Sequence, residues 1–204
     1  MIFNYELITK VVNKKNQVFE INKILNSSLK VIKDLDSISD EINQSIKQIV
    51  KCIKNGKKII LFGNGGSAAD AQHIAAELIG RFNLERKSYP AISLTSNSSI
   101  ITALANDYSF DVSFSRQCEC LVNNGDIVIG ISTSGNSTNV KNALMVSKKK
   151  GALTIGLLGN RGGTIKKITD IAIIVNSNST PRIQEAHRLI YHIICEIVEK
   201  ELNK

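Results

Sequence analysis

Residues 59–68 read Ile-Ile-Leu-Phe-Gly-Asn-Gly-Gly-Ser-Ala, an apolar run that ends in a glycine-rich turn before a helical pattern. Residues 127–137 repeat this arrangement, because the apolar run 127–131 leads into the polar turn Ser-Thr-Ser-Gly-Asn-Ser at 132–137. Turns of this kind present backbone N–H groups and hydroxyls to an anion. Two of them in one chain predict a site for a phosphorylated small molecule.

From residue 58 onward, short β-branched runs alternate with helical patterns. Runs such as 127–131 show no polar alternation, which indicates strands covered on both faces. Strands that alternate with helices predict a three-layer α/β fold with a doubly wound, parallel five-stranded sheet, in which ligands bind beyond the carboxyl ends of the strands. We expect strands at 58–62, 91–95, 126–131, 153–158 and 171–175, and helices at 67–82, 98–105, 111–122, 138–150 and 181–202.

The first quarter of the chain differs from this pattern. Residues 3–54 have helical spacing with a break around 34–39, so we predict an N-terminal helical extension of two helices. No linker-like or low-complexity stretch divides the 204 residues. We therefore expect a single domain over 1–204, with the N-terminal helices at 1–55 and the α/β core and C-terminal helix at 56–204.

Composition limits the partners and the compartment. The net charge of +8 would attract phosphates, but the basic residues are scattered and not interleaved with aromatic ones, so we expect no nucleic-acid partner. No apolar run approaches the ~20 residues of a membrane span, and Met1 to Lys10 lacks the apolar segment of a signal peptide. We expect no membrane partner and a cytoplasmic location.

Four cysteines form no C-x-x-C pair, and two of them, Cys52 and Cys195, lie among Ile and Val. This pattern favours reduced, structural thiols over a disulfide or a thiolate metal site.

Gly63, Gly65 and Ala68 also fit the dinucleotide fingerprint. That function requires an acidic residue at the end of the second strand to hold the ribose, but the chain has Leu-Thr-Ser at 94–96. The turn also lacks the Gly-Lys-Ser/Thr of a nucleotide P-loop. The pattern thus disfavours a nicotinamide enzyme.

The helix expected after the first turn carries polar residues three or four positions apart: Asp70, His73, Glu77 and Arg81. His73 and Glu77, one turn apart, could ligate a metal, or Glu77 could serve as a general base. A solvent-facing polar stripe would explain the same spacing.

In the last helix, one line holds Gln184, Arg188 and His192. Leu and Ile residues flank His192, so we expect a buried imidazole that needs a polar partner. A nearby side chain or backbone carbonyl could form that hydrogen bond, but His73 and Glu77 also need partners, which makes a purely structural role for His192 less favoured. His187, on the neighbouring line, has the weaker claim to a functional role.

The second turn supplies four hydroxyls in six residues, from Ser132, Thr133, Ser134 and Ser137. A helix start with free N–H groups and these hydroxyls suits a phosphate monoester. Capping a helix requires only one of them. We interpret this turn as the phosphate anchor.

Together these residues resemble the sugar isomerase (SIS) family and, within it, the phosphoheptose isomerases. The similarity runs from about Lys57 to Glu199. The motifs that carry it are Gly63-Asn64-Gly65-Gly66-Ser67-Ala68, Asp70-Ala71-Gln72-His73, Asn106-Asp107, Gly130 to Ser137, and Arg182-Ile183-Gln184-Glu185-Ala186-His187.

The resemblance implies conversion of sedoheptulose 7-phosphate to D-glycero-D-manno-heptose 7-phosphate, the first step of bacterial heptose synthesis for lipopolysaccharide or capsule. It implies a homotetramer with active sites shared between subunits. It also implies one zinc per subunit, with the ligands His73, Glu77, Gln184 and His192. Glutamine is an unusual zinc ligand, and the residue pattern alone would not have identified it.

The resemblance further implies that Glu77 and His192 are the catalytic pair. Glu77 would remove the carbon-bound proton and His192 would exchange protons with the oxygens. The implied substrate contacts are Asn64, Gly65, Gly66, Ser67, Glu77, Asn106, Asp107, Ser132, Thr133, Ser134, Ser137 and Gln184. Some relatives have an acidic residue where this chain has Pro181, which puts one substrate contact in doubt.

A binding protein is the alternative function. A close SIS relative is a tetramer that binds the replication initiator DnaA, and other SIS domains sense phosphosugars. The initiator-binding relative lacks a pair equivalent to Glu77 and His192, so the presence of both residues here favours catalysis. Fold alone does not distinguish the two functions.

Overall fold

Five parallel strands form one sheet in the order β2-β1-β3-β4-β5. The computed structural model describes residues 5–204, with side chains described from residue 16 onward. The strands are β1 (Ile59–Gly63), β2 (Ala91–Ser93), β3 (Ile127–Ser132), β4 (Leu153–Leu158) and β5 (Ile171–Ile174). The predicted five-stranded parallel sheet is confirmed, and each strand begins and ends within two residues of its expected bounds.

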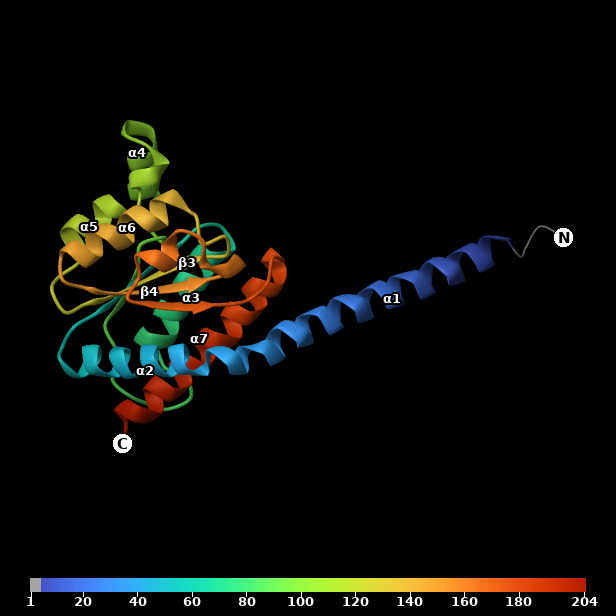
Figure 1. The fold of residues 1–204 in the computed structure, drawn as a ribbon, viewed down its shortest axis with the longest axis horizontal. Coiled ribbons are helices and arrows are strands. Elements are labelled where there is room, and N and C mark those ends of the chain that lie inside the picture. The colour runs from blue at the N-terminus through green and yellow to red at the C-terminus, as the bar shows by residue number, and fades with distance from the viewer. Residues whose placement is uncertain (1–4) are drawn as a thin grey trace.

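Helices cover both faces of this sheet. The helices α2 (Ser39–Lys54), α3 (Gly66–Ile79) and α7 (Thr180–Leu202) lie on one face, and α5 (Ser115–Leu121) and α6 (Thr138–Lys149) lie on the other (Figure 1). Successive residues of β3 alternate between the two cores: Ile127 and Ile129 pack with α2, α3 and α7, whereas Val128 packs with α5 and α6. Burial on both faces explains why the strand sequences are continuously apolar.

The N-terminal extension is confirmed as two helices. The first, α1 (Tyr5–Lys33), projects from the α/β core (Figure 1), and the 3-10 helix η1 (Asp34–Ile38) joins it to α2. Its contacts with the core are made mainly to α7. No helix among residues 5–204 is both long enough and apolar enough to cross a membrane.

The helix expected at 111–122 is wrong in detail. The chain forms a short 3-10 helix, Phe110–Val112, before α5 begins at Ser115. Before it, α4 (Ser98–Asp107) rises beyond α5 and α6 (Figure 1) and buries none of its side chains. Two further 3-10 turns, Asn160–Gly162 and Ile165–Lys167, lie between β4 and β5.

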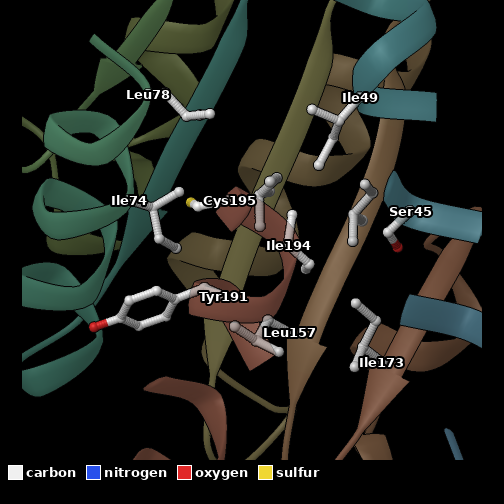
Figure 2. A pocket seen from close by; sticks show the side chains of 11 residues that line it. Ser45, Ile49, Ile74, Leu78, Leu157, Ile173, Tyr191, Ile194 and Cys195 are labelled. Carbon is white, nitrogen blue, oxygen red and sulfur yellow. The ribbon is translucent and has the colours of Figure 1, made fainter. Parts of the chain in front are cut away.

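A small enclosed cavity of roughly 20 Å³ lies between the sheet and the helices α2, α3 and α7 (Figure 2). Its lining is apolar apart from Ser45, whose hydroxyl already donates to the Glu41 carbonyl over 2.9 Å. The ring of Tyr191 lines it, while its hydroxyl points toward α3 (Figure 2). A space this small and this apolar is not a ligand site.

Candidate active site

The two polar turns lie side by side at one edge of the sheet. Gly63 pairs with Ile131 in the parallel register, so β1 and β3 end together. The chain places β2 on one side of β1 and then β3 on the other side, so the strand order reverses between β1 and β3. Open α/β sheets bind ligands at such a switch point.

A pair of amides links the first turn to α6. Asn64 Nδ2 donates to Asn139 Oδ1, and Asn139 Nδ2 donates to Asn64 Oδ1, each over 2.9 Å. Asn139 is buried. The sequence had not pointed to Asn139, because only the fold places α6 beside a turn 75 residues earlier.

The hydroxyls of the second turn form a cluster. Ser132 Oγ lies 3.0 Å from Ser137 Oγ and 3.4 Å from Ser134 Oγ. Ser137 precedes α6 and makes no capping hydrogen bond within the described part of the chain. The first N–H groups of α6 and these hydroxyls therefore face the same turn, as an anion site requires. Thr133 is half-buried in the same turn.

Three of the predicted site residues converge where α3 packs against α7. His73 and Glu77 on α3 meet His192 on α7, with potential ligand atoms all within 4.8 Å of one another. His73 Nε2 lies 2.9 Å from Glu77 Oε1, and the rings of His73 and His192 meet edge to face with centroids 5.2 Å apart. Sequence spacing placed each residue on its helix, and the packing of α3 against α7 brings them together.

Tyr191 joins this cluster, and the sequence analysis had missed it. Its hydroxyl oxygen lies 3.0 Å from His73 Nδ1 and 3.4 Å from Asp70 Oδ1. Arg188 Nε donates to the same oxygen over 3.1 Å. In the sequence, its position directly before His192 was the one indication that Tyr191 belongs to this site.

Burial shifts the protonation of these groups. It raises the pKa of Tyr191 to about 12, so the hydroxyl keeps its proton at neutral pH. Burial also raises the pKa of Asp70, against the opposing effect of Arg188. Burial and the neighbouring His73 lower the pKa of His192, which favours a neutral imidazole.

Two imidazoles and one carboxylate form the donor set of many catalytic zinc sites, which keep a further position open for water or substrate. The cluster of His73, Glu77 and His192 therefore fits a zinc ion. The side chain of Gln184 lies against Gly66 instead, because a Cβ atom added at Gly66 would be 2.5 Å from Gln184 Nε2. It is eight residues from His192, about 12 Å along α7. Within one chain, Gln184 does not join the cluster.

The first turn and the start of α7 face a common groove. Its volume is about 310 Å³, and its lining residues are Gly66, Ala69, Asp70, Pro181, Gln184, Glu185 and Arg188. Pro181 stands in the first turn of α7, where its missing N–H costs no helical hydrogen bond. Two residues of the first turn are also constrained by the fold. Gly65 has a φ of +55°, which favours glycine, and Ser67 is buried at the start of α3.

Other predicted residues lie apart from the cluster. Asn106 and Asp107 are exposed at the end of α4 and bond to each other over 2.9 Å. Arg81 faces solvent near Glu85. His187 is fully buried and shares a hydrogen bond with the Leu158 carbonyl, which agrees with its weaker claim to function.

Comparison with known proteins identifies the family. The sequence profile of the SIS domain matches residues 23–159, about two thirds of the chain. The chain belongs to the SIS domain family. The resemblance to the SIS family that was expected from the sequence is thereby confirmed.

Relatives with about 50% identity include proteins named phosphoheptose isomerase. A phosphoheptose isomerase from Pelobacter propionicus is 56% identical over 155 residues, which are 76% of this chain and 82% of that protein. One from Geotalea daltonii is 51% identical over 90% of this chain and 96% of its own length. The solved structure of a phosphoheptose isomerase from Neisseria gonorrhoeae has a TM-score of 0.86 at 35% identity, covering 90% of this chain and 99% of that one.

Proposed function

We propose that this SIS-domain protein is a phosphoheptose isomerase, an aldose–ketose isomerase that converts sedoheptulose 7-phosphate to D-glycero-D-manno-heptose 7-phosphate. Its identity of 56% and 51% to two proteins of that name, over 82% and 96% of their lengths, supports the proposal. The structural observation that carries it is the convergence of His73, Glu77 and His192. A carboxylate base and an imidazole in one place are what a proton-transfer reaction requires.

The reaction moves one proton between adjacent carbons and another between their oxygens. In our proposal, Glu77 removes the carbon-bound proton and His192 exchanges protons with the oxygens. The position of His192 beside Glu77 in the cluster supports this role. A zinc ion held by the cluster would polarise the substrate carbonyl as a Lewis acid.

The hydroxyl turn at 132–137 is the proposed phosphate anchor. Its clustered Oγ atoms and the open N–H groups of α6 support this role. An anchored phosphate would fix the register of the sugar with respect to the acid and base. We also propose that the first turn, from Asn64 to Ser67, contacts the substrate.

We further propose a homotetramer with shared active sites. The long helix α1 exposes several large apolar side chains, each at least half exposed: Val18, Phe19, Ile21, Ile24, Leu25 and Leu29. An apolar face of this size on a projecting helix suits burial against other copies. Another subunit could also complete the site with the implied contributions of Gln184, Asn106 and Asp107. Light scattering of the purified protein would measure the assembly.

The cytoplasm is the proposed compartment. All four cysteines are free, and three of them, including Cys52 and Cys195, are buried. Free thiols are typical of a reducing compartment.

The test is isomerisation by the zinc-loaded protein of sedoheptulose 7-phosphate and, for comparison, of unphosphorylated sedoheptulose. We expect conversion of the phosphate ester and little conversion of the free sugar. No conversion of the ester would reject the heptose assignment and favour the initiator-binding or phosphosugar-sensing function.

A further inference from the structure

A line of hydrogen-bonding groups runs from the buried carboxylate of Asp70 through Tyr191 to His73. We propose that Asp70 and Tyr191 act as positioning residues that set the tautomer of His73 and so prepare its Nε2 atom for a metal ion. This inference rests on the proposed metal site. It assigns a function to two residues outside the implied ligand set.

Both ring nitrogens of His73 have polar neighbours. Nδ1 faces the Tyr191 hydroxyl at 3.0 Å, and Nε2 faces Glu77 Oε1 at 2.9 Å. An ionised carboxylate only accepts hydrogen bonds, and a neutral imidazole carries one proton. In the metal-free chain, the proton therefore belongs on Nε2 of His73, where it bonds to Glu77. Nδ1 then accepts from the Tyr191 hydroxyl.

A metal ion at Nε2 requires the opposite arrangement. The lone pair of Nε2 must face the metal, so the ring proton must move to Nδ1. One proton leaves Nε2 for solvent and one bonds to Nδ1, with no net change in charge. Nδ1–H then donates to the Tyr191 oxygen, and the Tyr191 O–H turns to Asp70, whose Oδ1 lies 3.4 Å away.

The carboxylate of Asp70 is buried and needs hydrogen-bond donors. Its side chain is only 4% exposed, and isolating a carboxylate from water is costly unless donors compensate. Its described donors are the Tyr191 hydroxyl and Arg188. The Arg188 contact is 3.5 Å long, and the arginine side chain is 60% exposed, so solvent screens its charge in part. Of these two donors only the Tyr191 hydroxyl is itself buried, so the carboxylate is placed to accept the Tyr191 proton.

The geometry around Tyr191 keeps the hydroxyl in place. The residue is 1% exposed, and its ring lines the small cavity of Figure 2 while the hydroxyl points toward α3. Arg188 Nε also donates a hydrogen bond to the Tyr191 oxygen. The single O–H proton of Tyr191 can therefore be donated either to His73 or to Asp70. Metal-ligating histidines generally require such a partner on the second nitrogen.

The test measures zinc affinity by competition with a chromogenic chelator for wild type, Tyr191→Phe and Asp70→Asn. We expect a roughly 10- to 100-fold loss of affinity in both variants, the usual effect of removing an outer-shell partner. Asn at position 70 can donate to the Tyr191 oxygen and hold its proton toward His73, the wrong arrangement for the metal. Tyr89→Phe is the matched control, because it removes a buried phenol hydroxyl that bonds only to Asn203 among the described residues.

Nitrogen-15 NMR of zinc-loaded wild type gives a second readout. We expect His73 with its proton on Nδ1, and a proton on Nε2 would overturn the proposal even if the variants failed to fold. Wild-type affinity in both folded variants would also overturn it, as would failure of wild type to bind zinc. Zinc binding that depends on Tyr191 in a protein without isomerase activity would retain this inference and reject the proposed function.

Discussion

Arg86 Nε lies 2.9 Å from Glu199 Oε1, and both side chains are almost fully buried. The arginine also donates to the carbonyls of Glu77, Leu78 and Gly80 at the end of α3. The carboxylate of Glu199, on α7, accepts from the N–H groups of residues 82–84. This pair therefore ties α3 to α7, the two helices that bring His73 and Glu77 to His192.

The first prediction concerns Glu199. Substitution Glu199→Gln leaves the Arg86 charge buried without its partner, and we expect a loss of about 3–5 kcal/mol in the free energy of unfolding. Urea denaturation measures it. Glu196→Gln is the control, since it breaks an exposed pair with Lys200 on the same helix and should cost under about 1 kcal/mol. Equal effects of the two substitutions would contradict this account.

The second prediction concerns Gly135 in the hydroxyl turn. Its φ is +66°, and a Cβ there would lie 2.3 Å from the backbone carbon of Gly162. We expect Gly135→Ala to raise the KM for the phosphosugar, because the turn must shift to remove the clash. Gly56→Ala, at a φ of +68° with open space around it, should cost only the roughly 1–2 kcal/mol of the left-handed conformation. An unchanged KM in Gly135→Ala would argue against the phosphate anchor.

The third prediction concerns pH. Burial lowers the pKa of His187 to about 4 from its ordinary value of 6.5. Its neutral form is favoured in the fold, so its contribution to stability is complete above pH 6.5 and is lost as the pH falls toward 4. Between pH 7 and pH 5 this loss amounts to about 2 kcal/mol. Urea denaturation at both pH values should show it in wild type and not in His187→Gln. The same pH dependence in that variant would assign the effect to other groups.

The fourth prediction concerns the amide pair between Asn64 and Asn139. Asn139→Ala removes both hydrogen bonds and leaves Asn64 unpaired, which we expect to cost about 1–3 kcal/mol and to weaken substrate binding. Asn142→Ala, on the same helix, removes only one solvent-exposed bond and serves as the control. Thermal melts and KM measurements check both. A variant as stable as the control, with an unchanged KM, would show that the pair does not organise the turn.

Much of the fold could be predicted from sequence because its strands are short, β-branched and buried on both faces. Turn residues such as Gly63 and Ser132 mark where the strands end. The predicted helix at 111–122 was wrong, because local spacing did not show that the chain leaves helical geometry before Ser115.

The site was predictable in part. Helical spacing placed His73, Glu77 and His192 on their helices, and the convergence of α3 and α7 then brought them together. The sequence did not predict Tyr191, Asn139 or the pair Arg86–Glu199, because their partners lie 75 to 121 residues away. Helical spacing also could not show that Gln184 lies against Gly66 within its own chain.

In the proposed mechanism, Glu77 and His192 transfer protons in the isomerisation of sedoheptulose 7-phosphate. The most direct measurement is the initial rate of the zinc-loaded wild type beside Glu77→Gln and His192→Ala, with zinc content determined for each protein. Per bound zinc, we predict turnover in wild type and a loss of roughly 10²–10⁴-fold in each variant. Turnover at the wild-type rate in either variant, or none in the zinc-loaded wild type, would contradict it.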